Sequence, residues 1–316
     1  GFVGEKDWEY KRIFEISEAE LDCDDVLLNC KMLDTICDVY VNSRLLFVGD
    51  NCFVAYSKSV KSFLNLGENE IRIVFKSPVN YVRDKYKKCP TPINSNGQNG
   101  IVHIRKPQSH FGWDWGPVLP LSGIIKDIEL QFVNNAKIDY LGITQRLEDG
   151  KAFVSVKADV TSFGNYECEI GITSPSGEVM TACGECAEFV IDNPELWWTY
   201  ELSGSKNQPL YTVSAKLKLN GKVLDEQSKK IGLRTIELNR ERDKYGRNFQ
   251  FILNGVPLFI KGSNYIPADS FITRFDKQKL DYMLDAVQFS NMNMIRVWGG
   301  GYYESCLLYT SPSPRD

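Results

Sequence analysis

The chain has 316 residues, of which 43% are hydrophobic and 25% are charged, as in ordinary globular proteins. Its 37 Lys and Arg residues against 41 Asp and Glu give a net charge of -4 with no basic block, which argues against a nucleic-acid partner. No apolar run approaches the roughly 20 residues that span a bilayer, so no membrane-spanning segment is expected, and the length suits about two to three domains. Because the first residue is Gly1, we interpret the chain as a fragment missing its start.

The first region, residues 1–133, has the period-two pattern of half-buried strands. Apolar and polar side chains alternate over 8–16 and again over 71–76. Polar turns and a loop rich in Asn, Gly and Pro over 90–100 separate these segments, and one further strand is expected over 124–132. Many short strands with polar turns predict a β-sandwich.

Near the end of this region lies an aromatic stretch, HFGWDWGPVLP, from His110 to Pro120. Its glycines and the Gly-Pro step predict a rigid exposed loop in place of a strand or helix. Trp113 and Trp115 flank the carboxylate of Asp114. Indole faces stack on the C–H faces of a pyranose while a carboxylate accepts hydrogen bonds from hydroxyls, so the pattern suits a sugar. The alternative is a buried tryptophan corner of the sandwich.

A second all-β region covers residues 134–237. Alternating segments over 166–173 and 211–219 predict half-buried strands, and Asn220-Gly221 predicts a two-residue hairpin turn. About a hundred residues of this kind suit an immunoglobulin-like sandwich. We expect the pair Trp197-Trp198, which follows Asn193-Pro194, to seal a domain edge in preference to binding sugar.

After a charged and exposed connection over 240–247, the pattern changes to strand, helix, strand. A short apolar strand is expected over 256–262 and a second over 294–298. Between them, apolar residues at helical spacing predict a helix capped by Thr273 or Asp276. Such a repeat implies a parallel sheet with its site at the carboxyl ends of the strands.

The cysteines and histidines favour neither a metal site nor a nucleophilic triad. Nine cysteines are spread without the spacing of a disulfide scaffold, and most are expected to be buried. Cys183 and Cys186 form a lone C-x-x-C, for which a local turn or a disulfide is favoured over zinc. His103 and His110, the only histidines, lie outside any nucleophile-elbow context. Residues 306–316, CLLYTSPSPRD, break every pattern and are interpreted as a non-native tail.

Several of these motifs closely resemble β-mannosidases of glycoside hydrolase family 2. The matching segments are FGWDWGP at 111–117, the stretch 193–211, IGLRTIEL at 231–238, FILNGVPLFIKGSNYIPADSF at 251–271 and NMNMIRVWGGGYYES at 291–305. The resemblance implies three domains in order: a jelly-roll sugar-binding sandwich over 1–133, an immunoglobulin-like sandwich over 134–237, and the first two βα units of a TIM barrel over 238–305. β-Galactosidases and β-glucuronidases of the family usually carry an Arg-x-x-His-Tyr segment after the second barrel strand, where this chain has Arg296-Val297-Trp298.

The resemblance also implies roles for individual residues. Substrate contacts in the terminal subsite are expected from Trp113, Asp114, Trp115 and Trp298. Possible cleft-lining residues are Asn264, Asp269 and Arg296. Without the family, Trp298 is as well explained as barrel core, Asn264 and Asp269 as turn or cap residues, and Arg296 as a residue that orients its neighbours.

The implied activity is the removal of a terminal β-D-mannose from β-mannosides and glycoprotein-derived oligosaccharides with retention of configuration. Retaining chemistry needs two carboxyl groups, which in the family are glutamates on later barrel strands. No residue of this chain is assigned either role, Glu304 being interpreted as a loop residue, so the chain alone is expected to be inactive. The alternatives are a non-catalytic carbohydrate-binding sandwich protein and a related exo-glycosidase such as a glucosaminidase. No metal or cofactor is implied, and the expected location is lysosomal, or else secreted or periplasmic.

Overall fold

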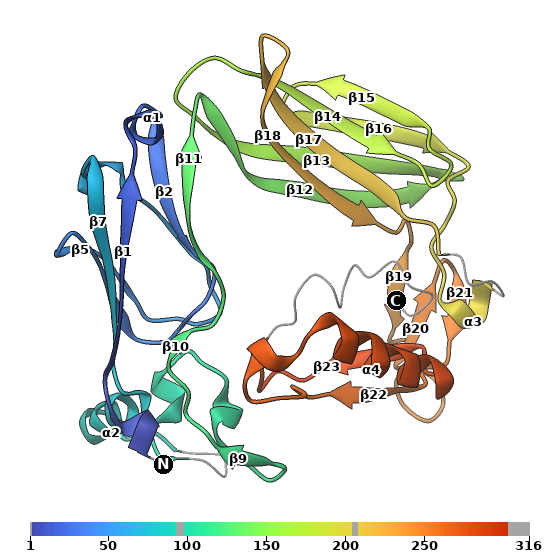
Figure 1. Cartoon of the computed structure of the whole chain (residues 1–316). Helices are drawn as coiled ribbons and strands as arrows, with labels where there is room; N and C mark the ends of the chain where they lie inside the picture. The colour runs from blue at the N-terminus through green and yellow to red at the C-terminus, as the bar shows by residue number, and fades with distance from the viewer. Residues whose placement is uncertain (1, 93–97, 204–207, 303–316) are drawn as a thin grey trace. The chain divides into compact units, whose positions relative to one another are not determined.

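The structure, a computed structural model, describes residues 2–92, 98–203 and 208–302 (Figure 1). The chain divides into two compact units. Of the described residues, unit 1 contains those in the ranges 2–133, 265–276 and 297–302, and unit 2 contains those in the ranges 134–264 and 277–296. Glu304 and the expected non-native tail, 306–316, lie outside the described residues. Within the described ranges, no helix is long and apolar enough to cross a bilayer.

Unit 1 contains the sandwich predicted for the start of the chain. Its first sheet has the order β1 (Trp8–Ile16), β7 (Gly67–Phe75), β4 (Cys37–Val41) and β5 (Arg44–Gly49). The second has the order β11 (Ile128–Val133), β2 (Asp25–Cys30) and β6 (Tyr56–Ser59). All these pairings are antiparallel. Alternate side chains of β2 and β4, such as Val26, Leu28 and Val39, meet in one core, as expected when each sheet buries one face.

Strand β1 forms as predicted, but the expectation that it is half buried is wrong. Of its nine residues only Ile16 is fully buried, whereas Tyr10 and Ile13 are 43% and 47% exposed. The reason is its position at the edge of the sheet, where it lines an apolar cleft of about 620 Å³ together with residues of both sheets. Period two identifies a strand, but it does not say whether another element covers that strand.

Helix α2 (Pro78–Lys88) follows the first sheet and is an element that the sequence analysis did not predict. Ser77 caps it by accepting a hydrogen bond from the backbone N–H of Asn80 at 3.0 Å, and Pro78 occupies the first turn, where its missing N–H costs nothing. Val79 and Val82, three residues apart, are buried. The Ser-Pro signal for a helix start is present in the sequence, but the period-two pattern of the strand before it dominates the segment.

The Ser77 cap allows a test of how much this helix depends on one side chain. Ser77 is 2% exposed, and its hydroxyl also donates to the carbonyl of Gly4 at 2.7 Å. The change Ser77→Ala removes both bonds, so we expect the free energy of unfolding of unit 1 to fall by about 1–2 kcal/mol. Urea unfolding measures this. The exposed Ser57→Ala is the control, and an equal loss in both variants would contradict the assignment.

Short elements complete unit 1. The strand predicted over 124–132 is two strands, β10 (Gly123–Ile124), which pairs with β3 (Leu33–Asp34), and β11. Among the described residues, the short helices of this unit are η1 (Phe2–Glu5), α1 (Glu18–Leu21), η2 (Lys61–Phe63), η3 (Ile101–His103), η4 (Gln108–His110) and η5 (Ile272–Arg274), and unit 2 has α3 (Tyr200–Ser203).

Unit 2 contains the second predicted sandwich. One sheet has the order β12 (Ala136–Glu148), β13 (Lys151–Ser162) and β16 (Cys186–Asp192). The other has the order β15 (Val179–Cys183), β14 (Glu167–Thr173), β17 (Tyr211–Leu219) and β18 (Lys222–Ile231). Alternate residues of β14 and β17, among them Ile170, Ile172 and Val213, are fully buried in a single core. The alternation predicted over both segments is therefore confirmed.

The turns of unit 2 follow their sequence signals. Asn220 and Gly221 have φ angles of 49° and 79° between β17 and β18, so the predicted two-residue hairpin turn is confirmed. Cys183 ends β15 and Cys186 begins β16, so the pair flanks the turn between these strands, and both cysteines are free and exposed. Of the two possibilities left open for this pair, the structure has the turn. Cys23, Cys30, Cys37, Cys52 and Cys168 are buried, as expected.

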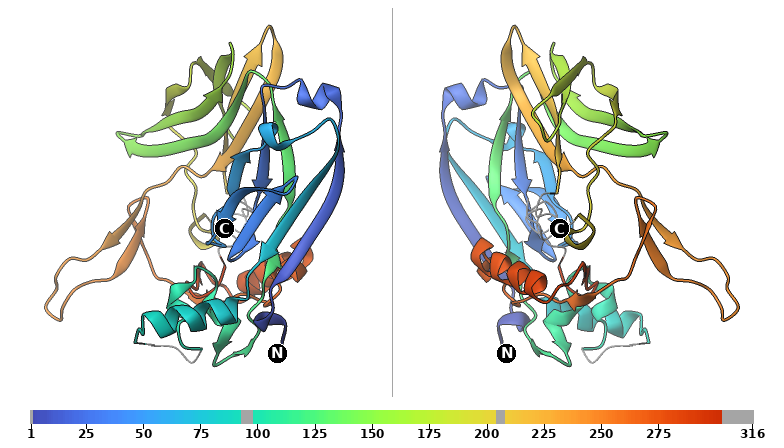
Figure 2. Two further views of the ribbon diagram at one scale, coloured as in Figure 1. Left: turned by 90° about the vertical axis from the view of Figure 1, so that its left-hand side faces the viewer. Right: turned by 90° about the vertical axis from the view of Figure 1, so that its right-hand side faces the viewer.

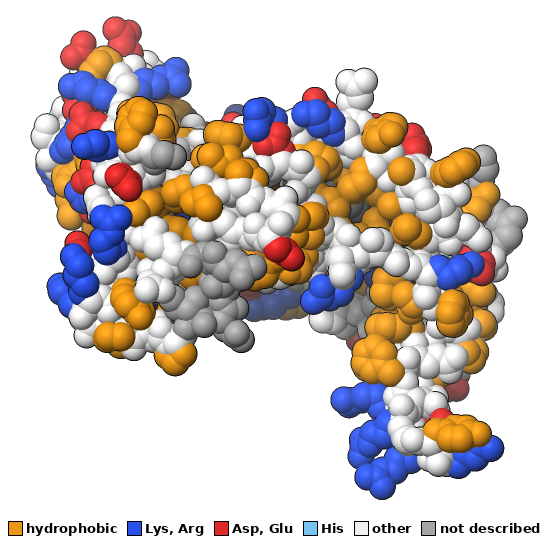
Figure 3. Space-filling view, turned by 90° about the horizontal axis from the view of Figure 1, so that it is seen from below, with side chains coloured by type: hydrophobic (Ala, Val, Ile, Leu, Met, Phe, Trp, Pro, Cys, Tyr) orange, Lys and Arg blue, Asp and Glu red, His pale blue; other side chains and the backbone are white. Residues whose placement is uncertain are grey.

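A three-stranded sheet follows, formed by β19 (Ile236–Asn239), β20 (Gln250–Leu253) and β21 (Val256–Leu258). Residues 240–247 are exposed as predicted, but they form the tip of the β19–β20 hairpin and do not connect two domains (Figure 2). In Figure 3 this hairpin ends in blue Lys and Arg side chains beside an orange hydrophobic one.

The strand expected over 256–262 is in fact two strands, because β21 stops at Leu258 and β22 (Gly262–Tyr265) begins four residues later. Helix α4 (Lys277–Phe289) and strand β23 (Met294–Val297) then follow. Strands β22 and β23 pair, and the backbone bonds join Lys261 to Asn293 and Tyr265 to Trp298. From the first bond to the second, the residue numbers increase on both strands, which is the pattern of parallel strands. The predicted strand, helix, strand unit is therefore present.

Candidate functional site

The aromatic stretch is a short hairpin, so the prediction of a loop without strands is wrong. Strand β8 (Phe111–Trp113) pairs with β9 (Gly116–Val118), with Asp114 and Trp115 at the turn. Gly112 makes this possible because its φ of 105° lies in a region that side chains with a Cβ rarely adopt.

Phe111 anchors the base of this hairpin. Its side chain is 2% exposed and packs with Val82 of α2 and with Ile101 and Ile104. The backbone N–H of Leu119 donates to the carbonyl of His110 at 2.9 Å and closes the hairpin. The first aromatic of the motif is therefore a core residue, and only the tip of the hairpin presents aromatic side chains at the surface.

The tip forms an aromatic cluster with Trp298, which follows β23. The ring of Trp298 lies edge-on to Trp113 at 5.2 Å and to Trp115 at 5.4 Å between centroids. Trp115 is 44% exposed, and the carboxylate of Asp114 between the two hairpin tryptophans is exposed as well. The structure thus brings together all four residues for which substrate contacts were predicted. Large aromatic faces beside a solvated carboxylate are suited to binding a polyhydroxylated ring.

The three glycines after Trp298 allow its ring to lie where it does. A Cβ on Gly300 would come within 2.1 Å of the Trp298 ring, and one on Gly301 within 2.4 Å of the Pro267 side chain. Only glycine leaves room for these contacts. The backbone of this turn is tied to the hairpin region, since the N–H of Ser109 donates to the carbonyl of Gly300 at 3.4 Å.

A narrow hollow lies beside the cluster. Three segments line it: the approach to the hairpin with Trp115, the loop from Pro267 to Ser270, and Tyr302. The larger cleft beside β1 has no tryptophan in its lining and carries mainly aliphatic side chains. We therefore place the candidate site at the aromatic cluster, where polar and aromatic groups converge, and not at the larger cleft beside β1.

The three residues proposed to line the cleft make contacts within the protein. Asp269, which borders the hollow, accepts hydrogen bonds from the N–H of Phe271 at 2.8 Å and from Arg274 at 2.7 Å, so it has the turn-forming role considered above. In unit 2, Arg296 donates to the amide oxygen of Asn264 at 3.1 Å and so orients a neighbour.

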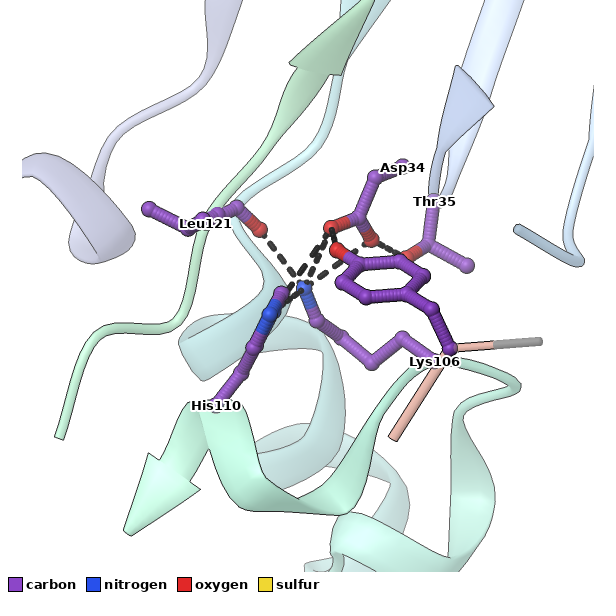
Figure 4. A network of polar contacts seen from close by, with 6 residues as sticks. Asp34, Thr35, Lys106, His110 and Leu121 are labelled. Carbon is purple, nitrogen blue, oxygen red and sulfur yellow. Dashed lines mark hydrogen bonds and ion pairs between the residues drawn. The ribbon is translucent and has the colours of Figure 1, made fainter. Parts of the chain in front are cut away.

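A buried polar network beneath the hairpin was missed by the sequence analysis (Figure 4). The Lys106 ammonium donates to both carboxylate oxygens of Asp34 at 2.9 and 2.8 Å, and both side chains are fully buried. It also contacts the Leu121 carbonyl at 2.7 Å and Nδ1 of His110 at 3.1 Å. The Tyr302 hydroxyl lies 3.4 Å from Asp34. The one local signal was an aspartate directly after the apolar pair Met32-Leu33, because its partner Lys106 is 72 residues away.

Burial shifts the pKa of two members of this network, His110 and Tyr302. It lowers the pKa of His110 to about 3, with a further lowering by the Lys106 ammonium and opposition from Asp34 and the Ser270 backbone. His110 is therefore neutral, and its Nδ1 accepts from Lys106. Burial, followed by the charge of Asp34, raises the pKa of Tyr302. The tyrosine stays protonated and donates to the carboxylate.

Two family models match the chain. A model described as glycosyl hydrolase 2 galactose-binding domain-like matches residues 1–126, and one described as glycosyl hydrolases family 2 matches residues 136–234. These matches cover the two sandwiches in the order predicted. The chain belongs to glycosyl hydrolase family 2.

Within that family the chain is similar to β-mannosidases. It is 32% identical to beta-mannosidase B of Emericella nidulans over 98% of this chain and 38% of that protein, and 33% identical to a probable beta-mannosidase of Caenorhabditis elegans over 98% of this chain and 37% of that protein. The crystal structure of a beta-D-mannosidase from Dictyoglomus thermophilum matches with a TM-score of 0.91 and 29% identity, over 99% of this chain and 40% of that one. The chain thus spans about two fifths of the length of these relatives.

A β-glucuronidase from Ruminococcus gnavus has a TM-score of 0.67 at 17% identity, a likeness that concerns the fold alone.

The neutral buried histidine predicts a pH dependence of stability. The unfolded chain binds a proton at His110 near pH 6.5, whereas the folded chain does so only near pH 3. This part of the stability is present above pH 6.5 and is lost as the pH falls toward 3. Between pH 7 and 5 we expect the free energy of unfolding of the wild-type chain to fall by about 2 kcal/mol more than that of His110→Gln.

Urea unfolding at several pH values measures the difference. The matched control is His103→Gln, because His103 is the other histidine and is only partly buried, hydrogen-bonded to the Cys89 carbonyl. It should keep the wild-type dependence. Identical slopes for wild type and His110→Gln would contradict the neutral buried state.

Proposed function

We propose that this chain is the N-terminal part of an exo-acting, retaining β-mannosidase that removes terminal, non-reducing β-D-mannose from β-mannosides and glycoprotein-derived oligosaccharides. The observation that carries the proposal is the cluster of Trp113, Trp115 and Trp298 around the exposed Asp114 carboxylate. Similarity to proteins named beta-mannosidase over nearly the whole chain supports the choice of sugar.

Each part of the cluster has a distinct task in this proposal. The indole faces stack on the apolar face of the terminal mannose, and their burial of the ring excludes water. The exposed carboxylate of Asp114 accepts hydrogen bonds from sugar hydroxyls. Binding through hydroxyls discriminates between epimers more strongly than apolar contact does, because a misplaced hydroxyl leaves the carboxylate unpaired. A pocket closed behind the ring limits the reaction to chain ends.

The chemical step belongs to parts of the longer protein. Retention of configuration requires two carboxyl groups about 5–5.5 Å apart, one as nucleophile and one as acid and base. In this proposal both are glutamates on later strands of a TIM barrel, of which β22, α4 and β23 form the beginning. The chain itself supplies binding of the terminal sugar. Neither a metal nor an organic cofactor enters the mechanism, and the proposed location is the lysosome or the cell exterior.

Kinetics of the full-length gene product test the proposal. We expect hydrolysis of an aryl β-D-mannoside in clear preference to the matching β-glucoside, β-glucosaminide and β-galactoside. The change Asp114→Ala should lower kcat/KM for the mannoside about 10- to 150-fold, the equivalent of one or two hydrogen bonds to a charged group. The control is Asp127→Ala, an exposed aspartate of the same unit.

If the full-length protein prefers a different sugar, it is a related exo-glycosidase and not a β-mannosidase. Mannoside binding without hydrolysis by the full-length protein would favour a carbohydrate-binding protein instead. Residues 1–316 alone should hydrolyse no aryl β-mannoside above a control that lacks protein. Activity of that chain would show that the assignment of the catalytic carboxylates to later strands is wrong.

A further inference from the structure

The buried network joins three segments that are far apart in the chain. Asp34 ends the short strand β3, Lys106 and His110 precede the aromatic hairpin, and Tyr302 follows the glycine turn after Trp298. His110 also hydrogen-bonds the backbone of Ser270 and lies edge-on to the Tyr302 ring at 5.3 Å. Figure 4 shows Asp34, His110 and the Leu121 carbonyl converging on the Lys106 ammonium.

The geometry around Lys106 leaves it little freedom. Its ammonium has three N–H donors, while four acceptor atoms lie within 2.7–3.1 Å of the nitrogen. Moving any of these groups would lengthen a charge-assisted bond in a site without solvent, where such bonds are strong. The network therefore holds fixed distances between β3, the approach to the hairpin and the Leu121 backbone.

Stability alone explains this arrangement poorly. Removing two charges from water costs several kcal/mol for each ion, and a buried ion pair is often no more stabilising than well-packed apolar residues of similar volume. What apolar side chains do not supply is direction, since hydrogen bonds fix angles and distances whereas apolar contacts tolerate sliding.

The network adjoins both segments that carry the aromatic cluster, namely the β8–β9 hairpin and the turn after Trp298. His110 immediately precedes β8, which carries Trp113, and its carbonyl closes the hairpin through Leu119. Tyr302 lies four residues after Trp298. A shift of His110 or of Tyr302 would therefore change the position of Trp298 relative to the two hairpin tryptophans.

We propose that Asp34, Lys106, His110 and Tyr302 are positioning residues that fix Trp298 against Trp113 and Trp115. None of the four needs to contact a sugar, and the catalytic consequence rests on the proposed function. A displacement of about 1 Å in groups that orient a substrate can cost on the order of 100-fold in rate. The network is the part of unit 1 whose loss would cause such a displacement.

The test removes both charges together with little change in volume, through the double variant Asp34→Asn/Lys106→Met. Lys106→Met alone is less informative, because it leaves the buried Asp34 carboxylate without its ammonium partner and so destabilises the fold. The control is Glu169→Gln/Lys218→Met, a pair with the same 2.8 Å separation in unit 2, partly exposed to solvent.

The main readout needs no enzymatic activity. Trp298 contacts both hairpin tryptophans, so its removal abolishes the ring contacts of the cluster. We therefore record the near-ultraviolet circular dichroism spectrum of residues 1–316 and subtract the spectrum of the same chain with Trp298→Phe. The difference spectrum measures the contribution of the aromatic cluster. We expect this difference spectrum to lose more than half its amplitude when both chains carry Asp34→Asn/Lys106→Met, and to persist when both carry the control pair. Urea unfolding shows whether each variant is folded. An unchanged difference spectrum in the folded double variant would overturn the proposal.

If the double variant does not fold, Tyr302→Phe decides, because it removes only the hydroxyl that contacts Asp34. A reduced difference spectrum at an unchanged urea midpoint supports the proposal, and an unchanged spectrum overturns it. In the full-length protein, the folded double variant should lower kcat/KM for an aryl β-mannoside about 10- to 100-fold, and the control pair should not. Absence of any mannosidase activity in the wild type would sink the proposed function but not the spectroscopic result.

Discussion

The Lys106 ammonium, buried against the Asp34 carboxylate, is the interaction on which the candidate site depends. A charge in such a place is tolerated only when it is paired and its remaining donors are satisfied, and here a backbone carbonyl and a neutral histidine complete the set. These requirements fix the chain on both sides of Lys106. The position of the β8–β9 hairpin that follows is set by these contacts of Lys106 and by the burial of Phe111.

The surface that results presents aromatic rings beside an exposed carboxylate. Apolar anchoring by Phe111 leaves the tip of the hairpin free to present two tryptophans, and the glycine turn lets the ring of Trp298 meet both. Aromatic faces provide affinity for a sugar ring but distinguish epimers poorly, whereas a carboxylate distinguishes them through its hydrogen bonds. Asp114 at the turn therefore suits recognition of a particular hexose more than adhesion to sugars in general.

The sequence predicted the elements whose signals are local. Alternation located β14 and β17, Asn220-Gly221 located a turn, and the Trp-Asp-Trp motif located an exposed stretch but not the two strands that carry it. Family resemblance added Trp298, which no local pattern connects to the hairpin. Where prediction from the sequence failed, the missing information was tertiary. Period two showed that β1 is a strand but did not reveal its exposed position at the edge of the sheet.

Two further failures have the same origin. The strand predicted over 256–262 is interrupted, and Gly262 then starts a new strand so close to Met294 that a Cβ would lie 2.2 Å from its carbonyl oxygen. The network of Asp34 and Lys106 joins residues 72 positions apart, and neither residue carries a neighbouring motif. Long-range pairing of single polar residues leaves no periodic trace in a sequence, and only a structure reveals it.

The most direct test of the proposed site is a crystal structure of the full-length protein with a non-hydrolysable β-mannoside bound. We expect the terminal mannose ring to lie against Trp113, Trp115 and Trp298, with a hydroxyl within hydrogen-bonding distance of Asp114. A terminal sugar bound elsewhere, with the cluster covered by protein side chains, would contradict the proposal.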